Sequence, residues 1–306
     1  MERDPGDIFE DPLEELSLGL ADIFATLEDV RVVYTPATGA VLYNGSLASF
    51  SDFATNLSAA AIATNARLKS VDRVRRLYVD EERISAATAA PAHALYTASY
   101  RLATNHMTRV WESLKPEPEA DASLGVFAAS IALQRLKYTL FAAHLLYQFG
   151  LVFEADTVAR QMLEQLGWAL TAETMDSHEQ LDAINTTKTI GRLARTLPHL
   201  GRLYGQLSKS AHAGIDEHRA VFSVHKSGRG QVGHGFTTRT RGAAVLIYLA
   251  DAWAVVTETT QRGHMQEYIA TDPREDFAPL PERAFLSEGM KLVHQLADIE
   301  EPEEEG

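Results

Sequence analysis

The spacing of apolar residues along the chain predicts a mainly helical protein. Between Ser123 and Phe149 apolar residues recur about every 3.6 positions, the period of one face of an α-helix. Spacing and helix-ending residues predict further helices over 47–68, 71–86, 91–114, 152–172, 181–197, 200–213, 240–269 and 284–296. The expected core residues are Phe127, Ile131, Leu133, Leu136, Leu140, Phe141 and Leu145 in the 123–149 helix, and Val245, Leu246, Leu249, Trp253 and Val256 in the 240–269 helix.

Two short stretches depart from the helical period and predict β-hairpins. Val30 to Tyr34 and Ala40 to Tyr43 are rich in β-branched and aromatic residues, and residues 35–39 between them include a proline and a glycine. Residues 218–225 alternate in polarity, and 231–238 can return as a second strand after the glycine-containing turn at 226–230. The second hairpin is therefore expected to interrupt a series of helices.

Proline and charge patterns predict where the chain divides. Pro116 and Pro118 stand among acidic residues, which is typical of a short, stiff linker. The expected organisation is an N-terminal helical region with a short hairpin over 1–118, a helical bundle over 119–275, and a last helix with an acidic tail over 276–306. The run from Asp298 to Glu305 carries charges of one sign and little apolar surface, so we expect it to be disordered.

Composition narrows the possible classes of protein. The 306 residues carry a formal net charge of −14 and no cysteine, which excludes disulfides, thiol catalysis and thiolate metal sites. The acidic start lacks the pattern of a signal peptide, and no uncharged apolar run reaches the length of a membrane span. We therefore expect a cytoplasmic protein without a membrane partner. Because nucleic-acid affinity depends on neutralising phosphates, any grip on nucleic acid would have to be local.

Five polar residues in the apolar helices are candidates for a site. Tyr204, Ser208 and His212 follow one another at intervals of one helical turn and share a face. Arg160 and Glu164 are one turn apart on an earlier helix. If the two helices pack, these groups converge within a mostly apolar bundle. Two structural explanations stay open, because Arg160 and Glu164 can be an ordinary helix pair and His212 can stabilise a helix C-terminus.

The order of these elements resembles a known family. A long helix, a helix with Arg-x-x-x-Glu, a helix of the type Tyr-x-x-Leu-Ser-x-x-x-His, a hairpin and a long closing helix are similar to the HEPN-like helical bundles of prokaryotes, especially uncharacterised branches near defence and abortive-infection genes. The resemblance covers about Ser123 to Ile269. It implies a bundle of four to five helices with an inserted β-hairpin, which often forms homodimers and sometimes has metal-independent ribonuclease activity.

In this family the ribonuclease activity uses an arginine followed, after four to six residues, by a histidine. The imidazole acts as general acid or base, and the guanidinium stabilises the phosphorane. Four pairs in this sequence have that spacing: Arg101 with His106, Arg192 with His199, Arg219 with His225, and Arg229 with His234. In the first pair Leu102 stands where the family has a polar residue.

Two hypotheses for function follow. The first is an effector of defence or stress response that acts on RNA, with a pocket lined by Arg160, Glu164, Tyr204, Ser208 and His212. The second is a non-enzymatic helical interaction module whose acidic surface binds a basic partner protein. We expect a homo-oligomer and no cofactor in either case. We also expect no metal, because the acids and histidines around the second hairpin match no recognised ligand spacing.

Overall fold

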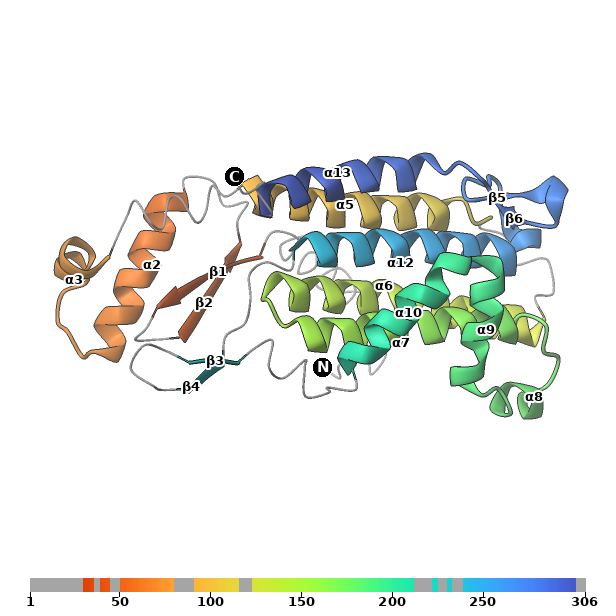
Figure 1. Ribbon diagram of the computed structural model, residues 1–306, viewed down its shortest axis with the longest axis horizontal. Helices are drawn as coiled ribbons and strands as arrows, with labels where there is room; N and C mark the ends of the chain where they lie inside the picture. The colour runs from red at the N-terminus through yellow and green to blue at the C-terminus, as the bar shows by residue number, and fades with distance from the viewer. Residues whose placement is uncertain are drawn as a thin grey trace, which may run out of the picture. The chain divides into compact units, whose positions relative to one another are not determined.

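The computed structural model describes residues 30–35, 39–44, 50–79, 91–115, 123–211, 222–224, 230–232 and 239–300. These residues are mainly α-helical, as the apolar spacing predicts. The chain divides into two compact units, one ending at Ala90 and the other beginning at Pro91. The larger second unit is a helical bundle (Figure 1).

The first unit contains the predicted N-terminal hairpin and two helices. Strands β1 (Val30–Thr35) and β2 (Gly39–Asn44) pair antiparallel, which confirms the hairpin. Helices α2 (Phe50–Asn65) and α3 (Val71–Tyr78) pack through a small core of Ala59, Ala63 and Val74. The side chain of Ser70 caps α3 by accepting a hydrogen bond from the backbone N–H of Arg73.

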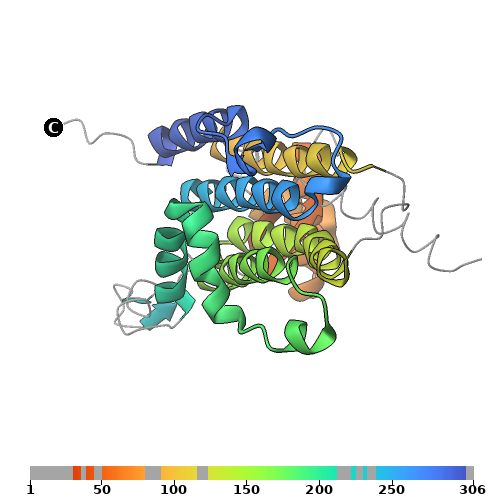
Figure 2. The ribbon, with the colours of Figure 1, turned by 90° about the vertical axis from the view of Figure 1, so that its right-hand side faces the viewer.

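The second unit is built around one central helix. Its helices are α5 (Pro91–Glu112), α6 (Leu124–Gln148), α7 (Val152–Ala172), α8 (His178–Asp182), α9 (Thr186–Thr196), α10 (Pro198–Ala211), α12 (Arg239–Thr260) and α13 (Ala284–Glu300). Figure 2 shows α5 and α13 on one side of α12 and α6 and α7 on the other, with α9 and α10 along one flank. The site described below lies where α7 meets α10.

Helix α12 carries buried residues on all of its faces and packs against α5, α6, α7 and α13, which explains its central place. The five core residues expected in this helix are buried, and the Trp253 indole N–H donates to the carbonyl of Leu133 over 2.9 Å. The helix is long and apolar enough to cross a membrane, and 83% of its apolar window is buried inside the bundle. Core helices of soluble proteins share these properties, so they carry no information on membrane association.

Helix α6 has apolar residues on two faces, and the expectation for it is only partly confirmed. Leu133, Leu136 and Leu140 are buried as expected. Phe127 and Ile131, however, are 58% and 53% exposed, so their assignment to the core is wrong. Apolar residues recur at the helical period on both faces of α6, and this period alone does not show which face packs against the core.

The division of the chain differs from the predicted one. Helix α5 packs against α12 and α13, and the boundary therefore falls at 90/91 instead of 118/119. Helix α13 likewise belongs to the bundle and extends to Glu300, so residues 298–300 are not part of a disordered tail. The Glu300 carboxylate accepts from the backbone N–H and the hydroxyl of Thr240 over 3.0 and 2.8 Å, which caps α12. Residues 301–306 lie outside the described residues.

Other helix boundaries differ from the predicted ones for reasons found in the local structure. The predicted 181–197 helix is two helices, α8 and α9, separated by residues 183–185. The helix expected to reach 269 ends at Thr260. The Glu258 carboxylate accepts from the backbone N–H groups of Ile269, Ala270 and Thr271, which turns the chain back into a short pair of β5 (Thr271–Asp272) and β6 (Ala278–Pro279). The second predicted hairpin is present as β3 (Phe222–Val224) and β4 (Gly230–Val232).

Candidate functional site between α7 and α10

Three of the five predicted site residues meet where α7 packs on α10. The Arg160 Nε donates to Glu164 Oε1 over 3.0 Å, and the Tyr204 hydroxyl donates to the same oxygen over 2.8 Å. The Arg160 guanidinium also lies over the Tyr204 ring, 5.4 Å from its centroid. The Glu164 carboxylate thus links α7 to α10 through the Tyr204 phenol, and the Arg160 guanidinium, on α7 itself, packs on the same ring.

This trio lies at the rim of the bundle, not in its interior as expected. The side chains of Arg160 and Glu164 are 22% and 17% exposed. Burial lowers the pKa of Arg160, but the contacts with Tyr204 and Glu164 outweigh it and raise the pKa above its ordinary value. The guanidinium is therefore a permanent positive charge that is both fixed in position and accessible from solvent.

Ser208 follows Tyr204 by one turn on α10. Its Oγ is buried and has no hydrogen-bond partner within the described part of the chain. Buried hydroxyls nearly always have a partner, so this oxygen is an exception among the described residues. His212 falls outside the described residues, so its place in the site stays a prediction.

The structure adds a second set of contacts that sequence reasoning missed. Asp156 lies one turn before Arg160 on α7 and is fully buried. The Tyr147 hydroxyl donates to Asp156 Oδ1 over 2.6 Å, and the Arg241 guanidinium of α12 pairs with Oδ2. Burial first, and the adjacent Asp156 next, raise the pKa of Tyr147 well above 10. Arg241 Nη2 also donates to Ser210 Oγ over 3.1 Å.

The α7–α10 seam is the name used below for these residues: Asp156, Arg160, Glu164, Tyr204, Ser208, Ser210 and Arg241. The one signal that pointed to its missed part is the one-turn spacing of Asp156 before Arg160 on the same helix face. The contribution of Arg241 had no such signal, because it depends on how α12 crosses α7. The seam spans three helices and joins two guanidiniums to two carboxylates.

The chemistry of the seam favours binding an anion. Asp156 is fully buried, whereas the side chain of its partner Arg241 is 44% exposed. In hydrogen bonds to described residues, the Arg160 guanidinium donates through Nε and the Arg241 guanidinium through Nη2, so other N–H groups of both guanidiniums are left for a ligand. Arginine forks with spare donors match phosphate and carboxylate groups.

A second polar cluster surrounds Arg283 on the other side of the bundle core. Arg283 Nε donates to Asp251 Oδ1 over 2.6 Å, and its Nη1 donates to the carbonyl of Leu280 over 2.7 Å. Asp251 is fully buried, and its Oδ2 has no partner among the described residues. The His106 ring stacks on Phe285 with centroids 3.8 Å apart, and its Nε2 is likewise buried without a described partner.

The charge of Arg283 influences both nearby imidazoles. Burial first, and then the charges of Arg109 and Arg283, lower the pKa of His106 to about 4. The pKa of His199 is also lowered, by burial and then by Arg283 and Arg202. Burial raises the pKa of Asp251, which the Arg283 charge partly offsets. The imidazoles are therefore neutral at pH 7, and the cluster holds a single ion pair.

The arginine–histidine pairs with ribonuclease-like spacing do not form sites of their own where they are described. Arg192 pairs with Glu173, whereas His199 lies against Tyr248, with ring centroids 5.3 Å apart. The Arg101 side chain is exposed, whereas His106 stacks on Phe285. The other two pairs lie outside the described residues. In the described ranges no group of three His, Asp or Glu side chains is placed to hold a metal ion.

Comparisons of this chain with family models, with curated proteins and with solved structures find no match. The kinship with HEPN-like bundles therefore stays a prediction from the order of elements and the two short motifs.

Proposed function

We propose that this chain is a HEPN-like effector of prokaryotic defence or stress response that acts on RNA in the cytoplasm, with the α7–α10 seam as its site. The observation that carries the proposal is the pair of accessible guanidiniums, Arg160 and Arg241, each held in place by a carboxylate. Arginines fixed in this way bind phosphate oxygens without losing much side-chain entropy on binding. The acidic chain as a whole thus offers a local grip on an RNA backbone.

The proposed reaction is cleavage of the phosphodiester without a metal. The 2′-oxygen attacks phosphorus while its proton passes to a base, and the bond to the 5′-oxygen breaks as that oxygen takes up a proton. Arg160 and Arg241 stabilise the negative charge of the phosphorane. His212, the residue directly after α10, supplies the imidazole that acts as acid or base. The products are a 2′,3′-cyclic phosphate and a 5′-hydroxyl.

The alternative is a non-enzymatic module that binds a basic partner protein. The observation in its favour is that the seam is already balanced, with two carboxylates for two guanidiniums. In that case the seam is a structural network, and the net charge of −14 attracts the partner.

Incubation of the pure protein with total RNA separates the two functions. The wild type should yield fragments with cyclic phosphate ends, and the variants Arg160→Ala and His212→Ala should lose most of this activity. Arg195→Ala, an exposed arginine on α9 outside the seam, is the matched control and should cleave like the wild type. Cleavage unchanged in both seam variants would remove the proposed site, and no cleavage by the wild type would favour the interaction module.

The proposal includes a homodimer, which is tested separately. Light scattering at micromolar concentration should give twice the mass of one chain. A species with the mass of one chain alone would remove the dimer without bearing on the seam.

A further inference from the structure

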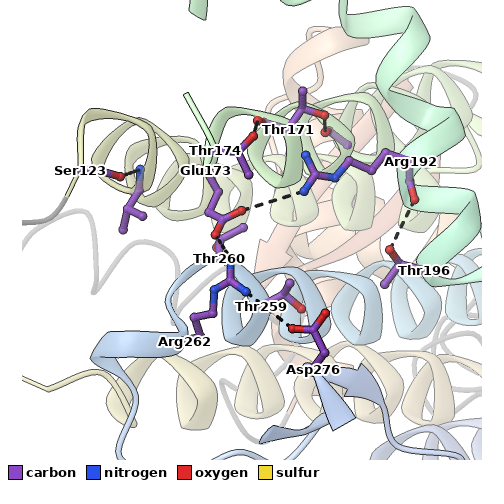
Figure 3. A network of polar contacts seen from close by, with 12 residues as sticks. Ser123, Thr171, Glu173, Thr174, Arg192, Thr196, Thr259, Thr260, Arg262 and Asp276 are labelled. Atoms are coloured by element: carbon purple, nitrogen blue, oxygen red, sulfur yellow. Dashed lines mark hydrogen bonds and ion pairs between the residues drawn. The ribbon is translucent and has the colours of Figure 1, made fainter. Parts of the chain in front are cut away.

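Helix α7 ends at a buried carboxylate that two arginines share. Figure 3 shows Glu173 between Arg192 of α9 and Arg262, which follows α12. The Arg262 guanidinium pairs with Glu173 Oε1, and Arg192 Nη2 lies 4.0 Å from Oε2. Three segments far apart in the sequence therefore meet at one carboxylate.

The carboxylate is inside and both cations face outward. The Glu173 side chain is 7% exposed, whereas those of Arg192 and Arg262 are 36% and 44% exposed. One buried negative charge thus holds two positive charges at the surface. Among the described residues Asp276 also pairs with Arg262, at 3.9 Å, but the Asp276 side chain is 96% exposed and such pairs are weak in water.

Two partly exposed aromatic rings, Phe277 and Tyr268, lie beside Arg262. The Arg262 guanidinium is 5.8 Å from the centroid of Phe277, and the Tyr268 ring is 5.4 Å from Phe277. The Tyr268 hydroxyl donates to the carbonyl of Arg262, which ties this ring to the same segment. An arginine and two rings are therefore assembled on one short stretch after α12.

The loop that carries Phe277 has an uncommon backbone. Asp276 and Phe277 both have positive φ, 48° and 57°, a conformation that bulky side chains rarely adopt. Asparagine or glycine would hold this turn with less strain. The ring of Phe277 is thus kept at a position where the backbone alone would favour another residue, which points to a use for the ring.

We propose that Arg192, Arg262, Tyr268 and Phe277 form a binding surface for single-stranded RNA, with the arginines on phosphates and the rings against bases. This inference rests on the proposed action on RNA and names a docking surface for it apart from the seam. Guanidiniums that follow the backbone and rings that stack with bases are the two parts of sequence-independent single-strand binding. A duplex keeps its bases stacked on one another and offers only its phosphates.

The test is fluorescence anisotropy with a labelled 12-nucleotide oligouridylate and with an RNA duplex of the same length, at one fixed salt concentration. Phe277→Asn removes the ring and suits the positive φ, so the fold is retained while single-strand affinity falls by about fivefold or more. Arg262→Lys keeps the charge but loses the fork, and should also weaken binding. Arg274→Ala is the control, because Arg274 is 88% exposed and already bound to Asp272 through both Nε and Nη2. Its affinity should match that of the wild type.

The outcomes separate this surface from the seam. Tight single-strand binding that Phe277→Asn weakens, with or without cleavage, supports the surface. Unchanged affinity in Phe277→Asn and Arg262→Lys overturns it, even if the RNA is cleaved. Equal binding of the duplex and the single strand also overturns it, because stacking would then contribute nothing. A wild type that binds neither RNA overturns the surface together with the proposed function.

Discussion

The α7–α10 seam and the Arg283 cluster each pair a fully buried aspartate with an arginine, yet they leave their charges in different surroundings. In the seam, Asp156 accepts from Tyr147 as well as Arg241, and the Arg241 side chain is 44% exposed. In the cluster, Asp251 has Arg283 as its one described partner, and the Arg283 side chain is 11% exposed. The same ion pair is thus open to a ligand in one place and enclosed by the core in the other.

Burial of the carboxylate alone therefore does not define a binding site. A guanidinium that reaches solvent can exchange water for phosphate oxygens, whereas an enclosed one must keep its partner. We therefore assign binding to the seam and a structural role to the Asp251–Arg283 pair.

The largest effect is expected from Arg283→Met. It leaves Asp251 buried without its cation, which should lower the free energy of unfolding by about 3–5 kcal/mol. Urea unfolding measures this loss. The double variant Arg283→Met with Asp251→Leu removes both charges and should recover most of the stability. A double variant no more stable than the single one would mean that packing of the arginine, and not its charge, stabilises the cluster.

A smaller effect is expected from acid, through His106. Its pKa of about 4 in the folded protein is below the ordinary value of 6.5, so the unfolded chain binds more protons between these pH values. Stability contributed by the neutral ring is therefore complete above pH 6.5 and is lost as the pH falls towards 4. The shift corresponds to about 3 kcal/mol.

Comparison of variants isolates this contribution from that of the carboxylates. Urea unfolding between pH 7 and 4 should show a shallower loss for His106→Phe, in which the stack on Phe285 is kept, than for the wild type. His178→Asn, at the exposed start of α8, should lose stability like the wild type. Identical pH profiles for all three proteins would show that protonation of His106 does not contribute to the pH dependence of stability.

The matching variant in the seam, Arg241→Met, should cost less than Arg283→Met. Asp156 keeps the hydrogen bond from Tyr147, and loss of a partly exposed partner should lower the free energy of unfolding by about 1–3 kcal/mol. The rate of RNA cleavage should fall by more than this modest loss of stability can explain. A loss of stability equal to that of Arg283→Met would erase the distinction between the two regions.

The sequence predicted helices well where a single apolar face packs, and it predicted the seam in part. One-turn spacing placed Arg160 and Glu164 on one face of their helix and Tyr204 on a face of another, and the prediction that they meet was conditional on the packing of these two helices, which the structure shows. The partners of Asp156 and Asp251 could not be predicted. Arg241 and Arg283 belong to other segments, and no local sequence pattern specifies how these segments pack against the helices that carry the aspartates. The prediction that Phe127 and Ile131 are core residues was wrong for a similar reason. In a helix that is apolar on two faces, the sequence pattern does not show which face packs.

The smallest effect on stability, and the sharpest test of the seam, is expected from Ser208→Ala. Its Oγ is buried and has no described partner, so removal of the oxygen loses no hydrogen bond and should change the free energy of unfolding by less than about 0.5 kcal/mol. Because Ser208 is one of the proposed site residues, cleavage should nevertheless fall clearly. Ser210→Ala is the matched control for the opposite case, because Ser210 Oγ accepts from Arg241 and its loss should cost stability. A Ser208→Ala variant that keeps both stability and full activity would remove Ser208 from the proposed site and leave Arg160 and Arg241 as the seam residues proposed to contact RNA.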